Sequence, residues 1–172
     1  MKVEVRFTIP EAEAEELTGA TAVVVDVLRA TTTLTTALSH GARAVFPSAS
    51  TDDALRLAQS LGREDTLLCG ERKGLRIEGY DLGNSPREYT RETVEGKRLI
   101  MNTTNGTRAF LAVEDADTVV ALSFLNLGAV ASEVRDRERL VVVCAGREDL
   151  FALEDAVCAG LLLQRLRDDG VE

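Results

Sequence analysis

Short apolar runs alternate with stretches of helical periodicity along the whole chain. The runs are rich in Val, Leu and Ile, and they predict strands at residues 3–7, 22–25, 44–46, 66–69, 98–101, 118–122 and 140–144. Apolar positions three and four residues apart predict helices at residues 31–39, 51–61, 107–113, 127–135 and 150–166. Strands that alternate with helices are typical of βα units. The pattern therefore predicts an α/β fold, a three-layer α/β/α arrangement with a largely parallel, or mixed, central sheet.

Nothing in the pattern marks a domain boundary within the 172 residues, and no internal repeat is seen. We therefore expect a single domain over residues 1–172. One long stretch, residues 71–88, contains three glycines and has neither helical nor strand periodicity. A loop of this length inside a compact domain is usually functional or disordered.

Polar residues gather directly after the predicted strands. In open α/β sheets, ligands bind beyond the carboxyl ends of the parallel strands. Residues 102–108, N-T-T-N-G-T-R, combine a glycine turn with a helix start, where backbone N–H groups suit an anion. We expect this segment to share one polar site with the segments that follow the other strands, which are residues 26–33, 70–73, 123–126 and 144–149.

The motif V-V-V-D-V-L-R-A-T-T-T places Asp26 at the end of a buried strand. Haloacid-dehalogenase-like enzymes have such an aspartate and a second acid two residues later, but that position is Leu28, so this interpretation is set aside. A carboxylate after three valines favours a ligand or a reactive group, although Asp26 as a helix cap stays open. The hydroxyls of Thr31 and Thr32 are expected to cap the helix or to bind a ligand.

The motif C-A-G-R-E-D resembles the loop of cysteine phosphatases only superficially. Those loops separate Cys and Arg by five residues, and here two intervene, so a phosphocysteine mechanism is rejected. Cys144 and Gly146 are still expected to line the pocket, and Arg147 is a good clamp for an anion. The other cysteines, Cys69 and Cys158, are expected to be reduced and buried.

The last predicted helix is apolar nearly all round and should be buried. Two of its residues, Glu154 and Asp155, are carboxylates, which are costly to bury unless they are paired or bound to metal. A salt bridge to an arginine is one explanation. The other is a Mg²⁺ site made of hard oxygen donors, for which the candidates are Asp26, Glu71, Glu154 and Asp155.

The segment G-Y-D-L-G-N-S-P-R-E-Y predicts a helix that starts at Pro86. Ser85 would be its N-cap and Glu88 would complete a capping box. Asn84 is not explained by capping, and we expect it to contact a ligand. Ser85 is a second candidate for such contact.

The amino-acid composition limits the classes of molecule that the protein is expected to bind. The formal net charge of −9 makes nucleic acid and anionic membranes poor partners. No apolar stretch approaches the ~20 residues of a membrane span, and the N-terminus lacks the apolar core of a secretory signal, so we expect a cytoplasmic protein. The one histidine, His40, lies at a predicted helix C-terminus and is expected to be structural, which weakens mechanisms that need a histidine base.

Taken together, five motifs resemble the 2-phosphosulfolactate phosphatase family. They are V-D-V-L-R-A-T-T-T, G-E-R-K-G, G-Y-D-L-G-N-S-P, T-T-N-G-T-R-A and C-A-G-R-E-D-L-F-A-L-E-D-A-V-C-A-G, in the family's order, over most of residues 20–160. The resemblance implies Mg²⁺-dependent hydrolysis of 2-phospho-3-sulfolactate to 3-sulfolactate and phosphate, a step of coenzyme M synthesis. It also implies a chain shorter at its C-terminus than the usual family member.

The resemblance and the residues together give the expected roles. Asp26, Arg29 and Arg147 are the candidate catalytic residues, with metal-bound water as the favoured nucleophile and Asp26 as the second candidate. A small anionic phosphoester is the expected substrate, and a homodimer is left open. An anion-binding module without catalysis is the main alternative, and an isomerase is disfavoured because His40 is the only histidine. The candidate substrate-binding residues are Thr31, Thr32, Arg72, Lys73, Asn84, Ser85, Thr103, Thr104, Asn105, Gly106, Thr107, Arg108, Cys144 and Gly146.

Overall fold

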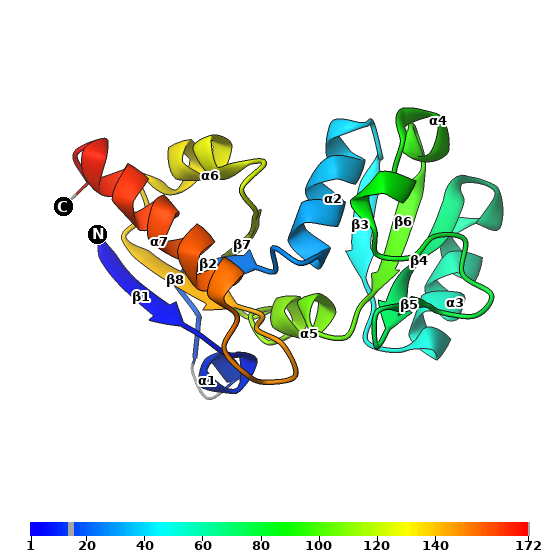
Figure 1. Cartoon of the computed structure of the whole chain (residues 1–172), viewed down its shortest axis with the longest axis horizontal. Coiled ribbons are helices and arrows are strands. Elements are labelled where there is room, and N and C mark those ends of the chain that lie inside the picture. The colour runs from blue at the N-terminus through cyan, green and yellow to red at the C-terminus, as the bar shows by residue number, and fades with distance from the viewer. Residues whose placement is uncertain (14–15, 172) are drawn as a thin grey trace.

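The computed structural model describes residues 1–13 and 16–171 and has an α/β fold with two mostly parallel sheets (Figure 1). The predicted α/β class is confirmed, but the strands are divided between two sheets instead of forming one central sheet. The first sheet has the order β1-β8-β2-β7, with β1 (Lys2–Arg6), β8 (Arg139–Cys144), β2 (Thr21–Val25) and β7 (Thr118–Leu122) all parallel. The second has the order β3-β6-β4-β5, with β3 (Ala44–Pro47), β6 (Arg98–Asn102) and β4 (Thr66–Arg72) parallel and β5 (Leu75–Arg76) antiparallel to β4.

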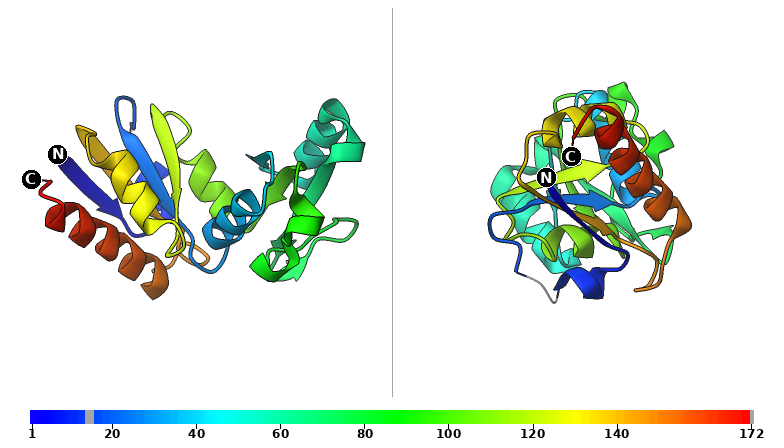
Figure 2. Two further views of the ribbon diagram at one scale, coloured as in Figure 1. Left: turned by 90° about the horizontal axis from the view of Figure 1, so that it is seen from above. Right: turned by 90° about the vertical axis from the view of Figure 1, so that its left-hand side faces the viewer.

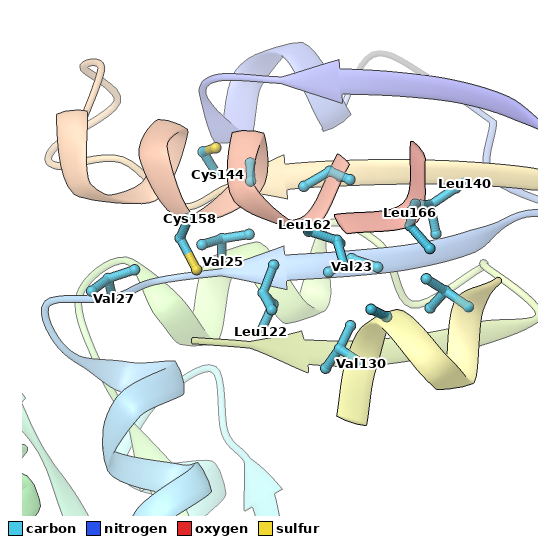
Figure 3. Packing of buried hydrophobic residues seen from close by; sticks show 14 residues of the cluster. Val23, Val25, Val27, Leu122, Val130, Leu140, Cys144, Cys158, Leu162 and Leu166 are labelled. Carbon is cyan, nitrogen blue, oxygen red and sulfur yellow. The ribbon is translucent and has the colours of Figure 1, made fainter. Parts of the chain in front are cut away.

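Helices cover both faces of the first sheet. Alternate residues of β2 point to opposite faces, so Val23 and Val25 pack toward α6 (Leu127–Val134) and α7 (Leu153–Asp168). Figure 3 shows these valines in one cluster with Leu162 of α7. The other face, which includes Val24, packs on α1 (Ile9–Glu13) and α5 (Gly106–Leu111). Burial on both faces explains why the inner strands β2 and β8 are nearly continuous apolar runs.

The second sheet is also covered on both faces. One face packs on α2 (Ala30–Ser39) and on the segment that contains the 3₁₀ helix η2 (Pro86–Glu88) and α4 (Arg91–Val94). The other face packs on α3 (Thr51–Leu61), which is followed by the 3₁₀ helix η1 (Arg63–Asp65). Helix α3 begins after Ser50, whose hydroxyl accepts a hydrogen bond from the backbone N–H of Asp53, 3.1 Å away.

The chain passes twice between the sheets. It leaves the first sheet after β2 and enters the second through α2, and it returns after β6 through α5. The left view in Figure 2 shows the two sheets as separate halves, with α2 and α5 between them. Both passages start at the carboxyl ends of parallel strands, so the polar segments after these strands face the junction of the two halves.

Several local predictions differ from the structure. Helix α7 begins at Leu153, three residues later than expected, and it is not buried all round, because Leu153, Val157 and Leu161 are 66%, 45% and 43% exposed. The predicted capping box is absent: Ser85 makes no side-chain cap bond, and the Glu88 carboxylate accepts the backbone N–H of Gly83 at 2.8 Å. In the part of the chain that the structure describes, no helix is long and apolar enough to cross a membrane.

Candidate functional site

A polar cavity of about 440 Å³ lies at the junction of the two sheets. It brings together Asp26, Asn105 and Arg147, which belong to three segments far apart in the sequence. Segments from both sheets contribute to its wall, as expected for a site beyond the carboxyl ends of parallel strands. The residues that line it are Asp26, Leu28, Arg29, Glu71, Lys73, Gly74, Asn84, Thr104, Asn105, Gly146, Arg147, Glu148, Glu154 and Asp155.

Asp26 follows β2 and is 6% exposed. The hydroxyl of Thr31 accepts a hydrogen bond from the backbone N–H of Asp26 at 3.0 Å and donates one to its carbonyl at 2.7 Å. The hydroxyl of Thr32 donates to the carbonyl of Val27 at 2.7 Å. Both hydroxyls therefore fix the turn that carries Asp26, and neither side chain lines the cavity.

The charge of Asp26 is poorly compensated. Burial, together with the negative charges of Asp155 and Glu71, raises the pKa of its carboxyl to about 7, although hydrogen bonds from the backbone of Ala30 and Arg29 act in the opposite direction. Such a carboxyl is close to half protonated at neutral pH. A bound cation would remove this penalty by supplying the missing opposite charge.

Asp155 lies in the first turn of α7 and joins the ends of two strands. Its carboxylate accepts hydrogen bonds from the backbone N–H groups of Val27 at 2.8 Å and Gly146 at 3.1 Å, which follow β2 and β8. Burial raises its pKa to about 6, although these two bonds act in the opposite direction. Glu154, its neighbour, also lines the cavity and is less buried.

In the segment after β6, some polar residues stabilise the local turn and others line the cavity. The Thr107 hydroxyl accepts a hydrogen bond from the backbone N–H of Thr103 at 2.9 Å, and the Thr103 hydroxyl accepts one from that of Thr107 at 3.0 Å, so this pair fixes the turn between β6 and α5. Thr104 and Asn105 line the cavity. Gly106 allows the close approach of two segments, because a Cβ there would overlap that of Ala30 and lie 2.7 Å from Oδ2 of Asp26.

Three cationic side chains line the cavity, on Arg29, Lys73 and Arg147. None of them forms an ion pair with another described residue, so their charges are available to an anion. Arg108, in contrast, pairs with Asp149 at 3.0 Å and does not line the cavity. Arg72, Ser85 and Cys144 also lie outside the cavity wall, and burial raises the pKa of the Cys144 thiol to about 12, which agrees with the rejection of a thiolate nucleophile.

Asn84 lines the cavity from the segment before η2 and is 6% exposed. Its Oδ1 is buried and has no hydrogen-bond partner among the described residues. A buried polar atom without a partner is costly, so this oxygen is a good candidate for ligand contact. Leu28 and Glu148 also line the cavity; they lie in segments expected to share the site, but they were not singled out as site residues. Gly74 lines it as well and lies just after the predicted segment 70–73.

The carboxylates fit a magnesium ion only in part. Among residues 1–13 and 16–171, no group of three or more His, Cys, Asp and Glu side chains is arranged to hold a metal. Both oxygens of Glu71 and both oxygens of Asp155 also accept hydrogen bonds from the protein. Mg²⁺ is commonly held by one or two carboxylates, water and substrate phosphate, and Asp26 with one neighbouring carboxylate suits that pattern.

The remaining predicted features of the chain have structural roles. The cysteines, Cys69, Cys144 and Cys158, are free and buried, as expected. His40 caps α2, and its Nδ1 lies 2.6 Å from the carbonyl of Tyr89. His40 is therefore held within the second half of the molecule by the chain near α4, outside the lining of the polar cavity.

Comparison with known proteins identifies relatives over nearly the whole chain. The family model described as 2-phosphosulpholactate phosphatase matches residues 7–172. A protein of Clostridium perfringens named probable 2-phosphosulfolactate phosphatase is 46% identical over 170 residues, which are 96% of this chain and 68% of that protein. Proteins with the same name from Clostridium acetobutylicum and Symbiobacterium thermophilum are 41% and 47% identical, over 98% and 88% of this chain and 72% and 65% of their own lengths. With these matches, the chain belongs to the 2-phosphosulfolactate phosphatase family.

Proposed function

We propose that this chain hydrolyses a small phosphomonoester that carries a carboxylate and a sulfonate besides the phosphate, with 2-phospho-3-sulfolactate as the substrate and Mg²⁺ as the cofactor. The observation that carries the proposal is the cavity of about 440 Å³, which combines carboxylates with cations from both sheets that form no ion pair with another described residue. The cations suit this anionic ester, and the carboxylates suit the Mg²⁺ ion. The reaction would then supply 3-sulfolactate as a step of coenzyme M synthesis.

Asp26, with Glu154, would hold the magnesium ion, because both oxygens of Asp155 already accept backbone hydrogen bonds. When bound, the ion supplies positive charge that polarises the phosphoryl group and lowers the pKa of coordinated water. The environment of Asp26 supports this assignment, because burial and the charge of Asp155 already disfavour its ionised form. A cation beside it makes the ionised form favourable again.

Arg29 and Arg147 would bind the phosphoryl group from the side of the first sheet. Their guanidinium groups line the cavity and are free of ion pairs among the described residues. In phosphoryl transfer the charge spreads over the equatorial oxygens, and fixed donors aimed at these oxygens lower the barrier. The side chains of Thr104 and Asn105 add uncharged polar groups at the same wall.

Lys73 would bind the sulfonate from the side of the second sheet. Lys73 lies in the turn after β4 and lines the cavity, whereas Arg29 and Arg147 follow strands of the first sheet. An ester that bridges the two halves therefore meets cations at both ends. Arg72 and Arg108 lie outside the cavity wall and contribute at most to the long-range field of this otherwise acidic protein.

For the attacking group we favour water, with the Asp26 carboxylate as the second candidate. Acid quenching during turnover, followed by reduction with borohydride, separates them. Attack by Asp26 on phosphorus would release the alcohol and leave an aspartyl phosphate, which borohydride reduces to homoserine, whereas direct attack by water leaves Asp26 unchanged. Mass spectrometry of the peptide that contains Asp26 reads the two outcomes.

The proposal is tested by phosphate release from 2-phospho-3-sulfolactate, compared with 2-phospholactate, which lacks the sulfonate. We expect release that stops with a chelator and returns with Mg²⁺, and a kcat/KM at least ~10-fold higher for the sulfonated ester. No release from either ester, together with tight binding of the intact ester by calorimetry, would instead identify a binding module. The cytoplasmic location and a homodimer stay predictions.

A further inference from the structure

Glu71 lies at the end of β4 and is 7% exposed. Its Oε1 accepts the backbone N–H of Thr104 at 2.7 Å, and its Oε2 accepts the backbone N–H of Gly74 at 2.7 Å. The hydroxyl of Thr104 donates to the same Oε2 at 3.1 Å. Each oxygen of this buried carboxylate therefore has at least one short hydrogen bond from the protein.

The donors come from two different segments. Gly74 belongs to the turn between β4 and β5, which also carries Lys73, and Lys73 has a left-handed φ of 52°. Thr104 belongs to the segment after β6, thirty-three positions away from Glu71. The carboxylate thus joins the turn that presents Lys73 to the segment that runs on to Gly106, which packs against Asp26.

The bonds are of the strong kind. Hydrogen bonds from backbone N–H groups to an ionised carboxylate are shorter and roughly twice as strong as bonds between neutral groups. A cation at Glu71 would compete with these donors for the same lone pairs, and the two N–H groups would lose their partner inside the protein. The contacts of Glu71 contrast with those of Asp26, whose carboxylate charge is left poorly compensated.

We propose that Glu71 is a positioning residue that holds Lys73 and Thr104 at the cavity, and that it is not a ligand of the metal. The carboxylate fixes the Lys73 turn against the segment after β6, so that the cation of the second sheet faces the carboxylates of the first. This inference rests on the proposed function for the role of Lys73. The hydrogen bonds from the backbone N–H groups of Thr104 and Gly74 to Glu71 are independent of the proposed function.

The test uses Glu71→Gln in the full chain. A glutamine carries one acceptor oxygen, so it satisfies the N–H of Thr104 or that of Gly74 but not both. We expect KM for 2-phospho-3-sulfolactate to rise about 10-fold and kcat to change less than ~3-fold, because substrate contacts are displaced while the reacting groups stay. The Kd for Mg²⁺ alone, measured by calorimetry, should stay within ~2-fold of the unsubstituted chain.

Glu78→Gln is the matched control. Glu78 is exposed on the loop after β5, lies outside the cavity wall and undergoes the same change of charge. We expect it to leave KM, kcat and Mg²⁺ binding unchanged. A Kd for Mg²⁺ raised 10-fold or more in Glu71→Gln, with KM unchanged, would show that Glu71 is a ligand and would overturn the inference.

Two further measurements separate positioning from general damage to the fold. In Glu71→Gln, amide exchange should accelerate at Gly74 or Thr104 and not in β8, so uniform acceleration contradicts the local role. Lys73→Ala should raise KM less in the Glu71→Gln background than alone, because both changes act on one contact. Fully multiplicative effects would contradict it.

If Glu71→Gln does not fold, Thr104→Val removes only the hydroxyl donor and should raise KM by about 3-fold with Mg²⁺ binding unchanged. A weaker Mg²⁺ affinity in this variant would overturn the inference as well. If the unsubstituted chain releases no phosphate, the proposed function fails. Calorimetry with Mg²⁺ and amide exchange still decide the role of Glu71.

Discussion

Asp26 at the end of the first sheet differs sharply from Glu71 at the end of the second. The surroundings of Asp26 raise its pKa to about 7. Glu71 is equally buried, but its carboxylate accepts three hydrogen bonds from two segments. Burying a carboxylate without compensation lowers stability, and such groups cluster at functional sites. The difference agrees with the proposed function, in which the first sheet holds the reacting groups and the second holds groups that fit the substrate.

Arg147→Ala should give the largest effect, because Arg147 follows the first sheet and binds the phosphoryl group in the proposed function. We expect kcat to fall by about 10²–10³-fold, as for the loss of one donor to a transition-state oxyanion. The side chain is exposed, so the melting temperature should stay the same. Steady-state kinetics with Arg167→Ala, an exposed arginine of α7 outside the cavity, provide the control. A near-normal rate for Arg147→Ala would contradict the assignment of the first sheet to catalysis.

The elements of both sheets could be predicted, but their division could not. The runs at β2, β6 and β8 are apolar because helices cover both faces, and this pattern is the same in either sheet. Periodicity contains no information on strand order, so nothing distinguishes β3, which follows α2 into the second sheet, from a strand of the first. The two-residue strand β5 and the short helices α1 and α4 are too brief to show a period.

For the site, the sequence predicted which segments meet at the cavity better than it predicted which atoms each side chain contacts. Asp26, Asn105 and Arg147 meet because parallel strands align their carboxyl ends, and that rule needs only the order of elements. The hydroxyls of Thr31 and Thr103 instead bond the backbone, and Arg108 pairs with Asp149. The partner of each side chain depends on which polar group lies within about 3 Å of it after folding. The residue types alone do not determine this.

Asp26→Asn should change the free energy of unfolding in a way that depends on pH, because the carboxyl of Asp26 has a raised pKa. The pKa of Asp26 is raised above its unfolded value of 3.8 to about 7, so the folded state holds an extra proton between these pH values. This contribution to stability is present at low pH and is lost as pH rises toward 7. In a chelator, we expect Asn to stabilise the protein by about 2 kcal/mol at pH 8 and by much less at pH 5.

Urea unfolding at both pH values measures this effect. Asp168→Asn, at an exposed position of α7, should show no such dependence on pH. Added Mg²⁺ should stabilise the unsubstituted chain at pH 8, by about 1.4 kcal/mol at 10 times its Kd, and should stabilise Asp26→Asn far less. Equal stabilisation of both proteins would place the ion away from Asp26.

Lys73→Ala should give the smallest effect and the one most specific to the second sheet. A single partly exposed contact between a cation and an anion is worth about 1 kcal/mol, so kcat/KM for 2-phospho-3-sulfolactate should fall by about 5–10-fold, mainly through KM. For 2-phospholactate, which lacks the sulfonate, the fall should be less than ~2-fold, because the contact that Lys73 makes is then absent. An equal fall for both esters would mean that Lys73 binds the phosphoryl group or the carboxylate, which the two esters share. The assignment of substrate fit to the second sheet would then be wrong, even if Arg147 binds the phosphoryl group as proposed.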